Sequence, residues 1–175
     1  ADCAMLLPAE IGDYTDFNAG IHHASNGGRR RGVTGAAALL PNYRHMPIAY
    51  HGRASSVRPS GAPLYRPHGQ FPPAAGESPI YGATRKLDFE LEIGIWIGRG
   101  NRLGEPVPIA AAPDHIAGYC LLNDWSARDM QRWESDRLGP FLGKSFLTTV
   151  SPWMITPEAL APFRAPGFVR AADDP

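Results

Sequence analysis

Residues 87–97, LDFELEIGIWI, decide the fold that the sequence predicts. Apolar side chains fill every odd position of this stretch, while Asp88, Glu90, Glu92, Gly94 and Trp96 fill the even ones. Such strict alternation is typical of a β-strand that has one face against a core. We therefore expect the odd, apolar face of this strand to be buried.

Outward from this strand, shorter elements follow along the chain. The apolar run 116–122 has the length of a buried strand, and 144–156 predicts another strand that Pro152 interrupts. Short helices are expected within 125–134 and 157–163. Gly and Pro make up 37 of the 175 residues, about a fifth, against an ordinary ~12%. The expected fold is one domain, mainly β with short helices and many turns.

Charge and cysteine content exclude several function classes. Lys and Arg together number 17, as do Asp and Glu, so neither a nucleic acid nor a membrane surface is the expected partner. No apolar run approaches the ~18 residues of a membrane helix. The basic run 29–31 fits a solvated turn or an anion site, and supports nucleic-acid binding only weakly. Two isolated cysteines, Cys3 and Cys120, favour a reducing, cytoplasmic setting.

Glu90 and Glu92 are the first candidates for chemistry. Residues i and i+2 of a strand point the same way, about 6.5–7 Å apart, so these carboxylates repel one another. If that face is buried, a hard cation such as Mg²⁺ or Ca²⁺ compensates them. The alternative is a solvated strand face that carries two ordinary surface carboxylates.

Asp16 and Asp124 strengthen the metal hypothesis. Each lies at an expected element boundary among apolar and aromatic neighbours, where a lone carboxylate is costly to bury. Local alternatives remain for both, since Asp16 fits a turn and Asp124 fits a helix N-cap.

Basic and polar side chains supply candidates for acid–base and anion chemistry. His22 and His23 follow Asp16 closely, and an imidazole near a metal site is a good general base, although spacing does not say which one acts. Lys144 lies in an apolar, Gly-rich stretch and either holds an anion or extends to the surface. Arg128 and Gln131 are three residues apart in the expected helix, so both can face one site.

Several long motifs resemble the fumarylacetoacetase family. They are LPAEIGDYTDF (7–17), LLPNYRHMPIAYHGRASSV (39–57), SGAPLYRP (60–67), YGATRKLDFELEIGIWIGRGNRLGEPVPI (81–109), and LLNDWSARDMQRWE with LGPFLGKSFLTTVSPW within 121–153. The resemblance covers about 7–163. It implies part of a mixed β-sandwich or β-roll catalytic domain. The implied reaction is metal-dependent hydrolysis of a C–C bond in fumarylacetoacetate to fumarate and acetoacetate, which ends tyrosine and phenylalanine catabolism.

The resemblance also implies roles for individual residues. It assigns a Mg²⁺ or Ca²⁺ site to Asp16, Glu90, Glu92 and Asp124, and water activation to His23. It assigns stabilisation of the oxyanion to Arg128, Gln131 and Lys144, substrate binding to Arg31 and Tyr50, and a place beside the metal to Thr148. The implied enzyme is a cytoplasmic homodimer in its full-length form. It acts on a small diketo dicarboxylic acid, with neither nucleic acid nor membrane as a partner.

The sequence departs from the family pattern in two side chains and in length. Asn18 and Ser135 stand where the family has substrate-contacting tyrosines, and the basic loop 27–36 has one extra residue. We expect residues 1–175 to be a partial catalytic domain that lacks the family's N-terminal β-barrel domain and the C-terminal half of its catalytic domain. The part without a counterpart includes the glutamate that orients the histidine, so a poor enzyme is expected from these residues alone.

These departures keep two other functions open. One is a related hydrolase or decarboxylase that acts on another diketo acid or an acylpyruvate. The other is a truncated, non-catalytic copy that serves in interaction.

Overall fold

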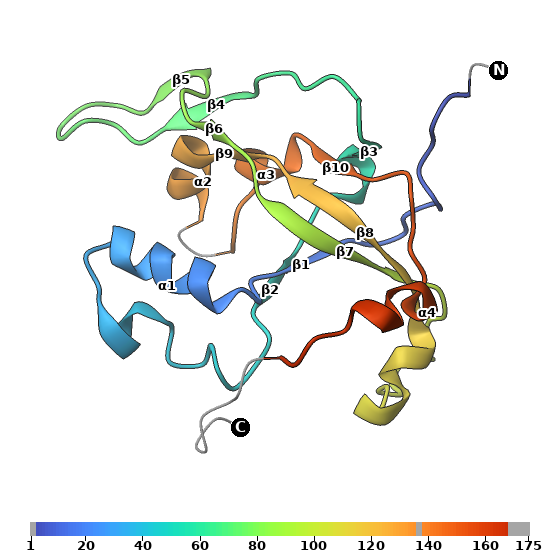
Figure 1. The fold of residues 1–175 in the computed structure, drawn as a ribbon. Coiled ribbons are helices and arrows are strands. Elements are labelled where there is room, and N and C mark those ends of the chain that lie inside the picture. Colours follow the sequence, from blue (N-terminus) through green and yellow to red (C-terminus); the bar gives the residue numbers. More distant parts are fainter. Residues whose placement is uncertain (1–2, 136–137, 168–175) are drawn as a thin grey trace. The chain divides into compact units, whose positions relative to one another are not determined.

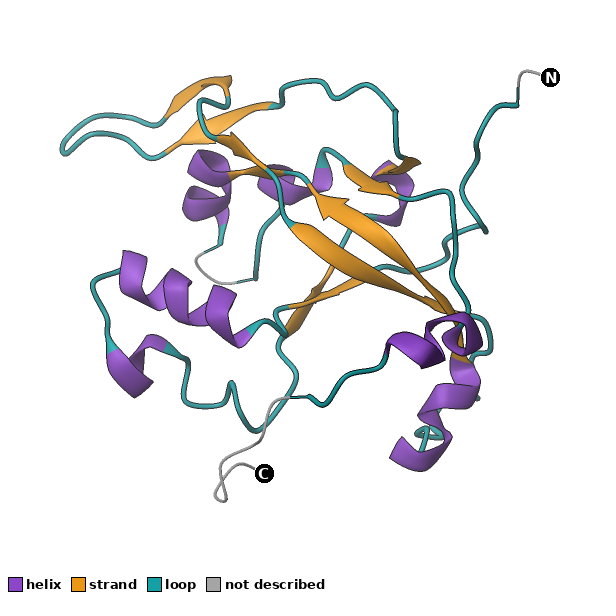
Figure 2. Ribbon diagram, viewed as in Figure 1, coloured by secondary structure: helices purple, strands orange, loops and turns teal. Residues whose placement is uncertain are grey.

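The computed structural model describes residues 3–135 and 138–167, and the chain divides into two compact units. Unit 1 contains the residues up to Gly12 and Arg53–Arg164, and unit 2 contains Asp13–Gly52 and the residues from Ala165 onward. Each unit is described by itself. Both consist of short strands and short helices (Figure 1 and Figure 2), which confirms the expected secondary-structure class.

Unit 1 is organised around a four-stranded mixed sheet in the order β3-β10-β8-β7. These strands are β3 (Val57–Pro59), β10 (Thr148–Val150), β8 (Ile116–Asp124) and β7 (Leu91–Ile97). β10 is parallel to β3 and antiparallel to β8, which in turn is antiparallel to β7. Two smaller antiparallel pairs join β4 (His68–Phe71) to β5 (Ile80–Ala83), and β6 (Leu87–Asp88) to β9 (Ser126–Ala127).

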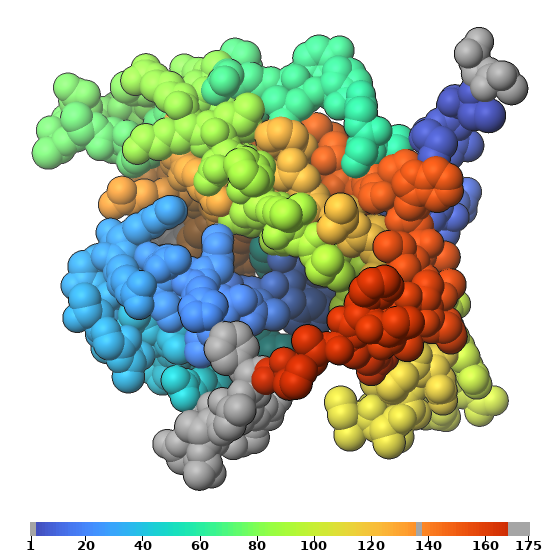
Figure 3. Space-filling model, in the orientation of Figure 1, coloured from blue at the N-terminus to red at the C-terminus, as the bar shows by residue number. Residues whose placement is uncertain are grey.

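Helices of one to two turns complete unit 1. They are α2 (Arg128–Glu134), α3 (Leu142–Ser145) and α4 (Pro157–Leu160), with 3₁₀ turns η2 (Ala54–Ser56), η3 (Ile109–His115) and η4 (Ala161–Phe163). The loop that joins β4 to β5 extends away from the rest of this unit (Figure 3). Among the described residues, no helix combines the length and the hydrophobicity needed to cross a bilayer.

The strand expected over 116–122 is confirmed and continues to Asp124. The helix expected within 125–134 begins only at Arg128, because Ser126 and Ala127 form β9 and pair with β6. The interrupted strand expected over 144–156 is confirmed only at Thr148–Val150. The backbone N–H groups of Lys144 and Ser145 donate to the Phe141 carbonyl, so these residues close the turn of α3, and β10 is only three residues long.

The predicted burial of the apolar face of residues 87–97 is also wrong. Leu91, Ile93, Ile95 and Ile97 are 55–72% exposed. The core lies under the opposite face, where Cys120 and Leu122 of β8 are buried. A Cβ on Gly94 would come within 2.8 Å of the Cys120 sulfur, so this face accepts only glycine there. The even positions therefore face the packed side of the sheet, where Trp96 Nε1 also donates to the Cys120 sulfur at 3.2 Å.

Unit 2 contains β1 (Thr15–Phe17) paired antiparallel with β2 (Ala49–His51), the helix α1 (Ile21–Arg30) and the 3₁₀ turn η1 (Gly35–Ala38). Gly28 is the contact point of α1 with η1, because a Cβ there would lie 2.2 Å from the Ala38 carbonyl oxygen. Arg29 and Arg30, expected in a solvated turn, form the last turn of α1, where their charge complements the helix dipole.

The unequal burial of the two faces of the sheet predicts unequal mutational costs. Leu122→Ala removes a side chain that is 8% exposed and should lower the free energy of unfolding by about 2–5 kcal/mol. Ile93→Ala alters a side chain that is 62% exposed and should cost about 0.5 kcal/mol or less. Urea unfolding of both variants measures the difference, and equal losses would contradict this assignment of the core face.

Candidate active site

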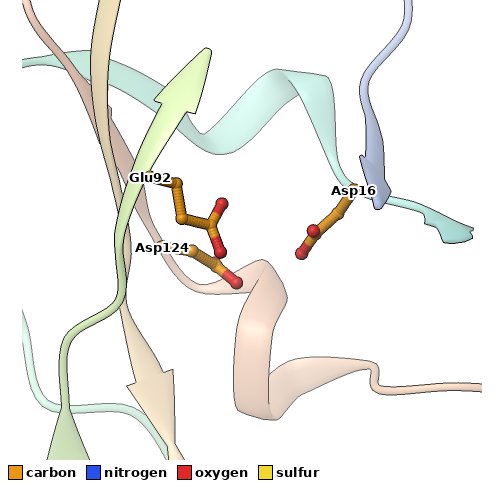
Figure 4. A group of neighbouring side chains, drawn as sticks. All are labelled: Asp16, Glu92 and Asp124. Carbon is orange, nitrogen blue, oxygen red and sulfur yellow. The ribbon is translucent and has the colours of Figure 1, made fainter. Parts of the chain in front are cut away.

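Two acidic side chains project from neighbouring strands of unit 1. Glu92 lies on β7 opposite Leu122 of β8, and Asp124 follows two residues later on β8, so both occupy the same face of the sheet. Their carboxylates have ligand oxygens within 4.8 Å of one another and reach toward the same side of the strand pair (Figure 4). Asp124 is 1% exposed. This pair has the spacing at which two carboxylates share one cation.

Glu90 is tied to two cationic side chains. Its Oε1 accepts from Arg128 Nη1 and its Oε2 accepts from Lys144 Nζ, each at 2.5 Å. Burial alone raises the pKa of the Glu90 carboxyl, but the charges of Lys144 and Arg128 outweigh burial and hold that pKa below its ordinary value. Glu90 is therefore ionised at neutral pH.

Lys144 joins Glu90 to Asp124. Its Nζ donates to Glu90 Oε2 and also to Asp124 Oδ2. The Lys144 side chain is 5% exposed, so the alternative that it extends to the surface is wrong. The N-cap alternative for Asp124 is wrong as well, since Ala127 is the N-cap residue of α2.

Arg128, the first residue of α2, holds three acceptors. Its Nε donates to Asp88 Oδ2 at 2.9 Å, and its Nη1 donates to Glu90 Oε1 and, at 3.1 Å, to Gln131 Oε1. The last contact confirms that Arg128 and Gln131 face one site. Burial alone lowers the pKa of the Arg128 guanidinium, but Glu90 and Asp88 raise it above its ordinary value. The guanidinium therefore stays charged.

Thr148 lies directly opposite Asp124 in the β8–β10 ladder and is 3% exposed. Its expected place beside the acidic cluster agrees with this register, since directly opposed residues of an antiparallel pair share a face.

Glu134 contributes to the site in a way that the sequence did not indicate. Its Oε2 accepts from the backbone N–H groups of Phe141 and Gly143, at 3.1 and 2.8 Å. Gly143 also lies against the backbone of Gln131, because a Cβ there would be 2.6 Å from the Gln131 nitrogen. These contacts fix α3, and with it Lys144, against α2. No local pattern marks such a contact, since the partners lie on either side of a loop.

The charge of this cluster suits a divalent cation. Asp88, Glu90, Glu92 and Asp124 supply four carboxylates and Arg128 and Lys144 supply two cations, so these six side chains have a combined formal charge of −2. Oxygen-only donors are those that Mg²⁺ and Ca²⁺ prefer. The residues present therefore fit a hard divalent metal.

Unit 2 carries the remaining candidates. Asp16 of β1, also drawn in Figure 4, pairs directly with Tyr50 of β2, so their side chains share one face of this two-stranded sheet. His22 and His23 are both exposed on α1, and Arg31 is the exposed residue that ends it.

Of the two family departures, Asn18 is exposed and its backbone N–H donates to the Ile48 carbonyl. The Ser135 hydroxyl donates to the Gln131 carbonyl at 2.6 Å, so it caps the C-terminal end of α2. The short polar side chain at position 135 thus satisfies a backbone carbonyl in the last turn of α2.

Together, the fold and the cluster define a mixed-sheet protein with an acidic site suited to a divalent cation. The family model described as fumarylacetoacetate (FAA) hydrolase C-terminal matches residues 14–168. The chain therefore belongs to the fumarylacetoacetate hydrolase family. This confirms the resemblance seen in the sequence motifs.

Individual relatives agree with this family. The chain is 57% identical over 164 residues to a fumarylacetoacetase of Bos taurus and 54% identical over 160 residues to one of Arabidopsis thaliana, which covers 93% and 91% of this chain. It spans only 39% and 38% of those relatives. A solved fumarylacetoacetate hydrolase of the psychrophile Exiguobacterium antarcticum shares the fold, with a TM-score of 0.54 and 22% identity over 90% of this chain and 47% of that one.

The role of Glu134 as a clamp on α3 can be tested by two substitutions. Glu134→Ala removes the acceptor of two backbone N–H groups and should lower the free energy of unfolding by about 1–3 kcal/mol. Glu134→Gln keeps an acceptor oxygen and should lose less than half of that. Urea unfolding compares the two variants, and equal losses would show that the clamp does not hold α3.

Proposed function

We propose that this chain carries the metal-binding and oxyanion-binding part of an enzyme that hydrolyses a C–C bond of fumarylacetoacetate, giving fumarate and acetoacetate. The observation that carries the proposal is the cluster of unit 1, in which Glu92 lies near Asp124, the buried Lys144 is bonded to Asp124, and the half-buried Arg128 is bonded to Glu90. Membership of the family and the names of the relatives support the same reaction.

Four carboxylates are proposed to hold Mg²⁺ or Ca²⁺. Glu92 and Asp124 already lie within 4.8 Å of one another, and Glu90 is bonded to the same lysine as Asp124. Asp16 of unit 2 is the fourth proposed ligand, on the strength of the sequence resemblance. When bound, the metal supplies Lewis-acid polarisation of the diketone oxygens.

The side chains of the chain itself carry the remaining steps. His23 accepts a proton from the attacking water, whose oxygen bonds to a carbonyl carbon of the diketone. Arg128, Gln131 and Lys144 donate hydrogen bonds to the oxyanion that forms. The C–C bond electrons then leave with the acetoacetate carbon, which takes up a proton.

Substrate binding falls to the residues of unit 2. Tyr50 shares a face with Asp16, which suits a hydroxyl that contacts substrate next to a metal ligand. Arg31 is a fixed positive charge suited to a substrate carboxylate. The proposed setting is the cytoplasm, in tyrosine and phenylalanine catabolism, with a homodimer as the full-length form.

One observation favours a second candidate, a related hydrolase or decarboxylase of diketo acids or acylpyruvates. Ser135 occupies a position where the family has a substrate-contacting tyrosine, and its hydroxyl is bonded to the α2 backbone. A pocket without that phenol suits a different or smaller acid. Turnover of an acylpyruvate faster than fumarylacetoacetate would favour this candidate.

Two substitutions test the metal assignment. Asp124→Asn and Glu92→Gln each remove one negative charge from the cluster while keeping the size of the side chain. We expect either to weaken Mg²⁺ and Ca²⁺ binding at least tenfold, about 1.4 kcal/mol, and to lower any turnover in parallel. Calorimetric metal titration and the metal-dependent loss of the diketone measure the two effects.

Asp114 provides the matched control, because it is an exposed aspartate of η3. Asp114→Asn should leave metal affinity and turnover unchanged. If Asp124→Asn binds metal as tightly as the unchanged chain, the ligand assignment is wrong. If the full-length form shows no metal-dependent loss of fumarylacetoacetate at saturating metal, the proposed reaction is wrong.

A further inference from the structure

Lys144 occupies the place between two of the carboxylates proposed as metal ligands. Its Nζ lies 2.5 Å from Glu90 Oε2 and is also bonded to Asp124 Oδ2. We propose that Lys144 is the counter-cation of the metal-free site and competes with the divalent cation for these two oxygens. This inference rests on the proposed function, which it extends from catalysis to the loading of the site.

Burial makes this competition strong. The side chains of Lys144, Asp124 and Glu90 are only 5%, 2% and 13% exposed. Charges withdrawn from water interact far more strongly than on the surface, and an uncompensated buried carboxylate is costly. Without Lys144, Asp124 would face the Glu92 carboxylate with one cation fewer nearby. The metal-free site therefore needs a positive charge at this point, and either Lys144 or a divalent cation can provide it.

The backbone fixes the ammonium group in this place. Lys144 lies within α3, a single turn whose start is held by Glu134 through the N–H groups of Phe141 and Gly143. At the other end of the same turn, Ser56 Oγ donates to the Ser145 carbonyl at 2.7 Å. A lysine on such a fixed turn orders only its own side chain in reaching its carboxylates, because the backbone is already held in place.

The competition links metal binding to the proposed oxyanion role of Lys144. An ammonium bonded to Glu90 and Asp124 has committed two of its three N–H donors to carboxylates. A cation that takes over these oxygens releases those donors for an anion. Lys144 would thus become an oxyanion donor only in the loaded site, and an unloaded site would keep its carboxylates neutralised.

The chain offers a matched control for this idea. The sequence contains two lysines, Lys144 and Lys86, and Lys86 is exposed. Lys144→Met and Lys86→Met make the same change of charge and size at a buried and at an exposed position. Both variants and the unchanged chain are titrated with MgCl₂ and CaCl₂ by calorimetry, and their thermal unfolding is followed with and without metal.

We expect Lys144→Met to lower the Kd for Mg²⁺ or Ca²⁺ at least tenfold, because a positive charge that is bonded directly to two of the ligand oxygens is removed. Without metal, the same variant should melt several degrees below the unchanged chain, and saturating metal should restore most of that loss. Lys86→Met should match the unchanged chain in both measurements. Equal or weaker metal binding by Lys144→Met would overturn the proposal.

A second measurement needs no variant and covers the case in which Lys144→Met does not fold. The unchanged chain is treated with an amine-acetylating reagent, with and without saturating MgCl₂, and acetylation at each lysine is measured by mass spectrometry. Acetylation of Lys144 relative to Lys86 should rise severalfold with metal. An unchanged or lower ratio would overturn the proposal.

Failure of this inference can be told apart from failure of the proposed function. Binding of metal by the unchanged chain, with no gain in Lys144→Met, would overturn the competition alone. Binding by Lys144→Met but not by the unchanged chain would support competition in its strongest form. Absence of metal binding in both chains would overturn the metal site and the competition together.

Discussion

The structure of unit 1 depends on one constraint, which is that buried carboxylates must be compensated. Glu90 and Asp124 come from neighbouring strand segments that share a backbone hydrogen bond, from the Asp124 N–H to the Glu90 carbonyl. Lys144 on α3 and Arg128 on α2 bring the opposite charge to them. These two cations thus link α2 and α3 to the carboxylates at the end of the β7–β8 pair.

A buried ion-pair network gives little reason to conclude that these residues are kept for stability. It gives more reason to conclude that they are kept for a chemical function. Replacing a buried ion pair by well-packed apolar side chains is often neutral or stabilising, whereas removing one partner alone costs about 3–5 kcal/mol. A sequence selected only for stability has little reason to keep this arrangement. The six named side chains include two more carboxylates than cations, which suits the divalent metal proposed for this site.

Much of this site could be predicted from the sequence, but the sequence did not indicate which cation is bonded to which carboxylate. The alternation over 87–97 located the strand and its acidic positions, and the three-residue spacing placed Arg128 with Gln131. Alternation shows that a strand has two different faces, and not which face is covered. Lys144 is 20 residues from Asp124 and 54 from Glu90, so no local pattern connects them.

Glu90 and Glu92 show what the i, i+2 spacing of a strand does not predict, which is the partner of each side chain. Spacing i, i+2 treats Glu90 and Glu92 as equivalent, yet Glu90 lies in the gap between β6 and β7 while Glu92 lies within β7. At the gap, Glu90 meets the helices and holds their cations, whereas Glu92 meets Asp124 across the sheet. The two glutamates thus have different partners, because Glu90 precedes the start of β7 and Glu92 lies within it.

The ion pairs inside unit 1 also separate the proposed roles of the two units. The ion pairs described above, which join Asp88, Glu90 and Asp124 to Arg128 and Lys144, lie within unit 1, while Asp16, His23, Arg31 and Tyr50 belong to unit 2. The cations of these ion pairs thus belong to the same unit as their carboxylates. Lys144 provides a positive charge to both Glu90 and Asp124 in the metal-free site.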